Sequence, residues 1–107
     1  MAKMSPTQLS LKHLREKGWT TIAIVEHWNC FARIRQDLFG FIDILALNDY
    51  GHVLAVQTTS YSNMSARCKK IADNINIGNV RKAEWKVEVH GWKKVGNKWE
   101  VKINDLS

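Results

Sequence analysis

Residues 33–60 read RIRQDLFGFIDILALNDYGHVLAVQTTS, and this stretch decides the fold of the chain. An apolar run at 38–47 precedes the turn signal Asn-Asp-Tyr-Gly at 48–51, and a second apolar run follows at 52–56. The pattern predicts two adjacent strands joined by a tight connection. Asp43 lies within the first strand, and the polar residues Gln-Thr-Thr-Ser directly follow the second.

Asp43 stands in an apolar strand, where an ionised carboxylate needs a partner because losing its hydration costs several kcal/mol. One interpretation is a buried Asp that backbone donors or an arginine satisfy, and the other is a metal ligand. Side chains alternate along a strand, so Gln57 and Thr59 share one face, and Asp43 shares it if the two strands pair. Neighbouring oxygen ligands at a strand end, with a backbone carbonyl and water, would suit Mg²⁺.

The size and composition indicate a single small domain, residues 1–107. A hydrophobic fraction of 45% with five tryptophans predicts a folded globule. No apolar run approaches the roughly 20 residues that cross a bilayer, and the first residues lack an apolar signal-peptide core. Cys30 and Cys68 have no metal or redox spacing, so we expect reduced thiols in a cytoplasmic protein, or in the host cytoplasm for a phage-encoded one.

The chain as a whole has a net charge of +6, and most of the positive charge lies in its second part. Residues 1–60 hold six Lys and Arg against five Asp and Glu, whereas residues 61–107 hold ten against five. A basic face of this kind suits a polyanion such as nucleic acid. The alternative interpretation is a solubilising surface.

The first helix has a clear start and a clear end. Ser5 is suited to cap it, Pro6 to be its first residue and Gln8 to complete a capping box. Gly18 is suited to end it. The sequence therefore predicts a helix over residues 6–17.

Residues 20–28 are rich in β-branched side chains and predict the first strand. Glu26, near its end, is either solvated surface or an extra ligand of the site. Asp37 follows a loop and comes just before the next strand, where it either caps a turn beside Arg33 or Arg35 or lines the same cleft as the strand aspartate. The two arginines would either neutralise the acids or bind phosphate.

Residues 64–76 predict a second helix, which Gly78 and Asn79 would end. Its buried stripe is expected to consist of Met64, Cys68, Ile71, Ala72 and Ile75. Arg67 and Lys70 fall on another face, with Lys69 to one side. This basic face is either a solvated surface or a phosphate-binding one, in which Arg67 would matter most because a guanidinium contacts phosphate bidentately.

The last part of the chain alternates with period two. One run at 85–90 and a second at 98–103 flank a turn at 96–97, which predicts a hairpin with an apolar face and a charged face that includes His90. Trp92 and Trp99 are suited to the core, to stacking on bases or to a dimer contact. The element order αβββαββ predicts an α/β fold with a mixed sheet.

The central stretch resembles the core of the PD-(D/E)XK nuclease superfamily, and most closely its small Holliday-junction resolvases and VRR-NUC members. The likeness is carried by GFIDIL at 40–45, then a hairpin, then LAVQTTS at 54–60. The family pattern has an Asp at the position of Asp43, followed by an acid, any residue and a lysine. In this chain Gln57 stands in place of the acid and Thr59 in place of the lysine.

The resemblance implies a restriction-endonuclease-like core and a metal-dependent DNA endonuclease of phage or mobile-element type, directed to branched or junction DNA. Mg²⁺ or Mn²⁺ would be held by Asp43 and Gln57, with Thr59 and Asp37 in the catalytic cluster. The family often has a glutamate near the start of its first helix, and Gln8 falls at about that position. Lys69, Lys70 or Arg35 would then replace the motif lysine.

The second interpretation belongs to another class of protein. Two amides in place of acids, and a threonine in place of the lysine, favour a nuclease-fold module that binds DNA or a protein partner without cutting. A homodimer and a small partner-binding protein also remain open. DNA contacts are expected from a group of basic residues, namely Arg33, Arg35, Arg67, Lys69 and Lys70.

Overall fold

The two apolar runs of the central stretch form the antiparallel hairpin of β4 (Ile44–Leu47) and β5 (Val53–Ser60), with Ile44 opposite Val56. The structure, a computed structural model, describes residues 4–107. Asn48 closes the turn, because its side-chain Oδ1 accepts hydrogen bonds from the backbone N–H groups of Tyr50 and His52, both at 3.0 Å. The predicted hairpin is therefore present.

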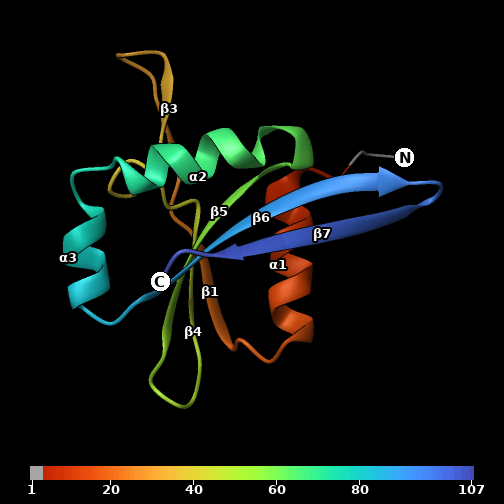
Figure 1. Cartoon of the computed structure of the whole chain (residues 1–107), viewed down its shortest axis with the longest axis horizontal. Coiled ribbons are helices and arrows are strands. Elements are labelled where there is room, and N and C mark those ends of the chain that lie inside the picture. The colour runs from red at the N-terminus through yellow and green to blue at the C-terminus, as the bar shows by residue number, and fades with distance from the viewer. Residues whose placement is uncertain (1–3) are drawn as a thin grey trace.

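This hairpin forms part of a five-stranded mixed sheet with the order β1-β4-β5-β6-β7 (Figure 1). The other three strands are β1 (Thr21–Ile24), β6 (Lys86–Val95) and β7 (Lys98–Asp105). Strands β5 and β6 pair in parallel, and the remaining neighbours pair antiparallel. The expectation of an α/β fold with a mixed sheet is confirmed.

Helices cover both faces of the sheet. On one face, Leu11 and Leu14 of α1 (Pro6–Glu16) pack against a cluster that includes Ile44, Leu54 and Val56. The other face is covered by α2 (Met64–Ala72), which follows the short 3₁₀ helix η1 (Tyr61–Asn63), and by α3 (Ile77–Lys82).

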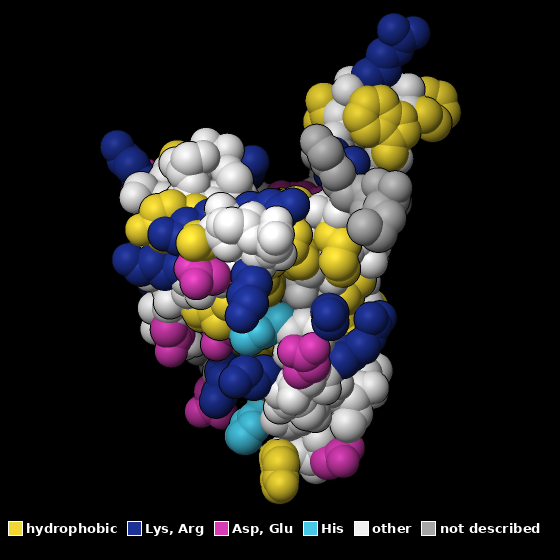
Figure 2. Space-filling view, turned by 90° about the vertical axis from the view of Figure 1, so that its right-hand side faces the viewer, with side chains coloured by type: hydrophobic (Ala, Val, Ile, Leu, Met, Phe, Trp, Pro, Cys, Tyr) yellow, Lys and Arg dark blue, Asp and Glu magenta, His cyan; other side chains and the backbone are white. Residues whose placement is uncertain are grey.

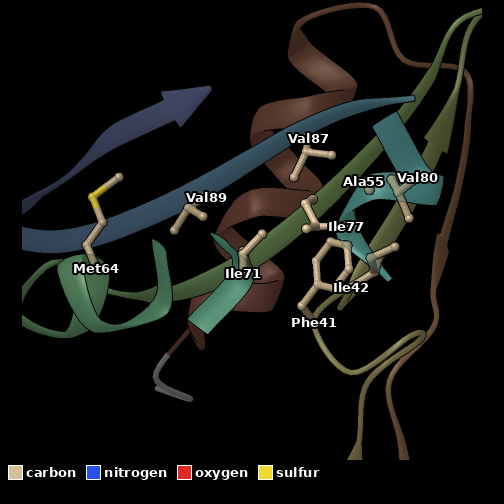
Figure 3. Close-up of a cluster of buried hydrophobic side chains, with 9 residues drawn as sticks. All are labelled: Phe41, Ile42, Ala55, Met64, Ile71, Ile77, Val80, Val87 and Val89. Carbon is tan, nitrogen blue, oxygen red and sulfur yellow. The ribbon is translucent and has the colours of Figure 1, made fainter. Parts of the chain in front are cut away.

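The larger core cluster lies beneath α2 and α3. Figure 3 shows its side chains spread along the space between the sheet, the helices and the segment before β4. Its members are Phe41, Ile42, Ala55, Met64, Ile71, Ile77, Val80, Val87 and Val89. Among residues 4–107, no helix is both long and apolar enough to cross a membrane.

The predicted strand at 20–28 is not continuous. It divides at Val25, whose N–H donates to the carbonyl of Asp43 at 2.8 Å, and the chain then leaves the sheet. Strand β2 (His27–Asn29) pairs instead with β3 (Ile34–Gln36) in a separate two-stranded ribbon, which the sequence pattern did not predict.

The limits of the central strands also differ from the prediction. The apolar run at 38–47 enters the sheet only at Ile44, because a turn with positive φ at Phe39 (56°) and Gly40 (86°) precedes it. In contrast, β5 runs beyond the apolar residues to Ser60, since β6 pairs with it along the polar end.

The predicted helix at 64–76 ends early, at Ala72, and a separate helix, α3, follows at 77–82 and contains the Gly78 and Asn79 that were expected to end the first one. The break arises because the side-chain amides of Asn74 and Asn76 both donate to the carbonyl of Phe39 at 3.2 Å. Ile75 and Ala72, which were assigned to the buried stripe, are exposed, and Ile77 and Val80 of α3 are buried instead.

His90 was assigned to a charged, solvated face but is completely buried, because β6 is covered on both sides. Its Nδ1 lies 3.0 Å from Ser10 Oγ on α1, and its Nε2 lies 3.0 Å from Glu88 Oε1. Trp92 Nε1 donates to the same Ser10 Oγ at 2.8 Å. Trp92 is thus a core residue, whereas Trp99 is 41% exposed.

Candidate functional site

A cleft of about 750 Å³ opens where β5 ends, between the start of α1, the foot of the β2–β3 ribbon and α2. Figure 2 shows a notch at the foot of this ribbon. The polar and charged residues that line the cleft are Ser5, Thr7, Gln8, Glu26, His27, Arg35, Asp37, Asp43, Gln57, Thr58, Thr59, Ser60, Arg67 and Lys70. The structure therefore brings together all four residues expected in the catalytic cluster.

Asp43 is the most heavily bonded acid of the cleft. Its Oδ2 accepts hydrogen bonds from Gln57 Nε2 at 2.6 Å, from the Thr58 N–H at 2.8 Å and from Thr58 Oγ1 at 3.3 Å. All three donors come from β5, the strand that pairs with β4. The register of the hairpin thus fixes one oxygen of the carboxylate.

Burial raises the pKa of the Asp43 carboxyl to about 8, and the nearby carboxylates of Asp37 and Glu26 add to the rise. The hydrogen bond from the Thr58 backbone N–H acts in the opposite direction. Because like charges and desolvation both disfavour the ionised form, a cation placed among these three acids would relieve the cost.

Glu26, Asp37 and Asp43 form an acidic cluster in which one oxygen of each lies within 4.8 Å of the others. Glu26 reaches it because β1 pairs with β4 and ends beside Asp43. Thr7 Oγ1 donates to Glu26 Oε1 at 3.4 Å, and Arg35 lies 3.8 Å from the same oxygen. Of its two interpretations, Glu26 as a residue of the site is the one that the geometry supports.

Gln57 is buried beside this cluster with an unused acceptor. Its Nε2 donates to Asp43, and its Oε1 is buried with no hydrogen-bond partner among the described residues. An unsatisfied buried amide oxygen is costly, at about 1–3 kcal/mol. Three carboxylates and an orphaned amide oxygen make a set of hard oxygen donors, which is the donor type that Mg²⁺ and Mn²⁺ accept.

Thr59 lies on the same strand face as Gln57, is 6% exposed and lines the cleft. Gln8 also lines it from the first turn of α1, where its backbone N–H donates to the capping Ser5 Oγ at 3.2 Å. Both positions thus adjoin the acids while carrying uncharged side chains.

The five expected DNA-contacting residues divide into two groups. Arg35, Arg67 and Lys70 line the cleft, and the last two extend from one face of α2. Arg33 lies instead near the tip of the β2–β3 ribbon with a φ of 55°, and Lys69 is an exposed residue of α2 away from the cleft lining.

Two threonines of the site were not recognised in the sequence as its side-chain donors. Thr58 donates to Asp43 through both its backbone and its hydroxyl, and its Oγ1 lies 3.1 Å from Thr7 Oγ1 on α1. The register of the hairpin could have identified Thr58. Because Ile44 is opposite Val56, the backbone N–H of Thr58, the residue after Gln57, comes next to Asp43. No local signal pointed to Thr7, which arrives through packing of α1 on the sheet.

Comparison with protein-family models, with curated proteins and with solved structures found no match. Any functional conclusion for this chain therefore rests on the geometry of the cleft.

Proposed function

We propose that this chain is a divalent-metal-dependent DNA endonuclease of the PD-(D/E)XK type. One observation carries the proposal, namely that Glu26, Asp37 and Asp43 converge in a cleft that Gln57 and cationic side chains also line. Metal-dependent hydrolysis of a phosphodiester requires acidic side chains that hold the metal and basic side chains that bind the phosphate. Both kinds of side chain line this cleft.

The residues present fit Mg²⁺ or Mn²⁺. Asp43, Asp37 and Glu26 would hold the ion through carboxylate oxygens, and Gln57 would contribute its unpaired amide oxygen. When bound, such an ion supplies a Lewis acid and a water of lowered pKa. In return, its charge would keep Asp43 ionised at neutral pH.

The remaining side chains position the substrate. Arg67 and Lys70, separated by one helical turn on α2, both line the cleft and would bind phosphate oxygens there. Thr58 holds Asp43 in one orientation through two hydrogen bonds. Among the three residues that would replace the motif lysine, Lys70 is favoured, because Lys69 lies outside the cleft lining and Arg35 is beside Glu26 at 3.8 Å.

Two substitutions test the proposal in a cleavage assay on linear, branched and single-stranded DNA with Mg²⁺, Mn²⁺ or EDTA. Asp43→Asn should abolish cutting while DNA binding in EDTA stays equal, because a pKa of about 8 leaves the metal-free Asp43 carboxyl largely protonated at neutral pH. Gln57→Glu should raise cutting by returning a charged ligand. Asp49→Asn, at an exposed acid of the β4–β5 turn, is the matched control and should change neither property. Cutting in EDTA, or cutting that survives Asp43→Asn, would refute the site.

A second function, a DNA-binding module that does not cut, is favoured by Gln57 and Thr59, which place uncharged side chains where the resembling nucleases have an acid and a lysine. In that case Gln57→Glu would add no cleavage and would weaken DNA binding modestly by repulsion. Calorimetry of Mg²⁺ and Mn²⁺ binding to wild type and Asp43→Ala supplies an independent readout, since a module without a metal site gives no heat in either protein.

A further inference from the structure

The β2–β3 ribbon projects from the molecule beside the cleft (Figure 1). It pairs only with itself and forms no part of the five-stranded sheet. Two-stranded ribbons of this length have little intrinsic stability. An exposed ribbon next to the acids therefore calls for an explanation beyond packing.

The ribbon carries apolar side chains into solvent. Trp28 is 62% exposed, Ile34 is 50% exposed and Phe31, at the tip, is 97% exposed. Figure 2 shows hydrophobic and basic side chains gathered on this projection. Scattered apolar residues are ordinary on a surface, but a cluster on a protruding element marks a binding surface.

The tip has a defined shape. Asn29 Oδ1 accepts hydrogen bonds from the N–H groups of Phe31 at 3.0 Å and Ala32 at 3.1 Å, which closes the turn. Arg33 completes the reversal with a φ of 55°. The Phe31 ring is thus presented outward by a hydrogen-bonded turn.

The charge of the ribbon favours a polyanion over a second copy of this basic chain. Residues 27–36 contain Arg33 and Arg35 and no acid. Trp28 is directly opposite Arg35 in the ribbon, and both line the acidic cleft at its foot. Proteins that bind nucleic acid use aromatic rings to stack on bases and neighbouring arginines to contact phosphate.

We propose that the ribbon is a wedge for strand junctions in DNA, in which Phe31 stacks on a base at the branch point and Arg33 holds a flanking phosphate. The inference rests on the proposed function and assigns the ribbon a role in it. Entering a continuous duplex requires unstacking a base step, which costs a few kcal/mol. At a branch point the terminal base is already open on one side, so the ring gains stacking without that cost.

The spacing of the ribbon relates the wedge to the acids. Asp37 comes four positions after Arg33 in the chain. A strand rises about 3.3 Å per residue, so the tip stands about 13 Å from the first acid of the cleft. That distance corresponds to about four base pairs of duplex. A junction held at the tip would therefore place a phosphate a few nucleotides from the branch over the acidic cluster.

Phe31→Ala, Phe31→Trp and the control Tyr50→Ala test the wedge in EDTA, where no metal-dependent cutting occurs. Tyr50 is an 84% exposed aromatic residue of the distant β4–β5 turn. Affinity is measured for a forked DNA and for a linear duplex of equal length, each with 2-aminopurine at the branch-point position. We expect wild type to prefer the fork and to quench its 2-aminopurine, and Phe31→Ala to lose about tenfold in fork affinity, together with the quenching.

Phe31→Trp should retain both properties and Tyr50→Ala should match wild type. Unchanged fork affinity and quenching in Phe31→Ala would overturn the wedge, as would a dimer in sedimentation that depends on Phe31 without any fork preference. The two proposals fail separately. Loss of the wedge leaves metal-dependent cutting of DNA in place, whereas quenching and fork preference without any cutting by wild type would refute the nuclease alone.

Discussion

Asp43 keeps its proton across the range in which most carboxyl groups have lost theirs, because burial and two neighbouring acids raise its pKa to about 8 from an ordinary value of 3.8. Between those values the native state binds more protons than the unfolded chain. The free energy of unfolding therefore falls as pH rises, by up to about 1.4 kcal/mol per pH unit. In EDTA, urea unfolding from pH 5 to pH 8 should show wild type losing stability relative to Asp43→Asn.

Wild type and Asp43→Asn also distinguish the effect of the Asp43 charge on stability from the effect of a bound metal ion. At pH 8, adding Mn²⁺ should raise the melting temperature of wild type in a concentration-dependent way and leave Asp43→Asn unchanged, because a ligand that binds only the native state stabilises it. Parallel stability slopes for the two proteins in EDTA would show that Asp43 does not titrate as the cleft geometry requires.

Part of this site could be predicted from the residues. Period-two alternation and a recognisable turn are enough to place Asp43 and Gln57 on one face of neighbouring strands, and their side chains indeed bond at 2.6 Å. Glu26 and Thr7 could not be assigned in this way. They reach the site because β1 pairs with β4 and α1 packs on the sheet, and neither contact is encoded within a local window of sequence.

At the scale of elements, α1 is held to the sheet by one buried polar network as well as by its apolar face. Ser10 Oγ accepts from Trp92 Nε1 and contacts His90 Nδ1, and all three side chains are buried. Ser10→Ala should lower the free energy of unfolding in urea by about 1–3 kcal/mol, because it leaves a buried donor and a buried ring nitrogen unpaired.

Ser62→Ala is the matched control, since the Ser62 hydroxyl bonds Ser60 Oγ at an exposed position. We expect a change within about 0.5 kcal/mol for this variant. Equal losses in the two variants would mean that the Ser10 network adds nothing to the docking of α1.

The predictions of element boundaries and burial that were wrong share a physical cause, namely tertiary contacts, or their absence, that a local stretch of sequence does not reveal. The helical spacing of apolar residues continues to Ile75, but Asn74 and Asn76 turn their amides to the carbonyl of Phe39, more than thirty residues away in the chain. The β2–β3 ribbon has no buried face, so its sequence lacks the alternation of apolar and polar residues by which a strand is recognised. Alternation placed His90 in solvent because it cannot reveal that a strand is covered on both sides.

At the scale of the whole molecule, the excess of positive charge lies on identifiable surfaces. The basic residues of the second part of the chain extend from α2, from α3 and from the β6–β7 hairpin, where the Nζ of Lys93 lies 4.6 Å from the Tyr61 ring centre. Under the proposed function, charge spread in this way would attract DNA at long range. Direct contacts between phosphates and the basic residues of the cleft should contribute further to DNA affinity. This contribution should depend on where the charges lie and not on the net charge alone.

Arg67→Ala with Lys70→Ala, compared with Lys17→Ala with Lys82→Ala, separates these two effects, because each pair removes two positive charges and only the first pair lines the cleft. DNA affinity is measured in EDTA over a series of salt concentrations. The cleft pair should reduce the slope of log K against log salt by about two units, roughly one for each lost phosphate contact, and weaken binding most at low salt.

The control pair, exposed at the end of α1 and on α3, should change the slope by much less. Equal effects of both pairs would indicate a diffuse field, and no effect of the cleft pair would make the basic face of α2 a solvated surface.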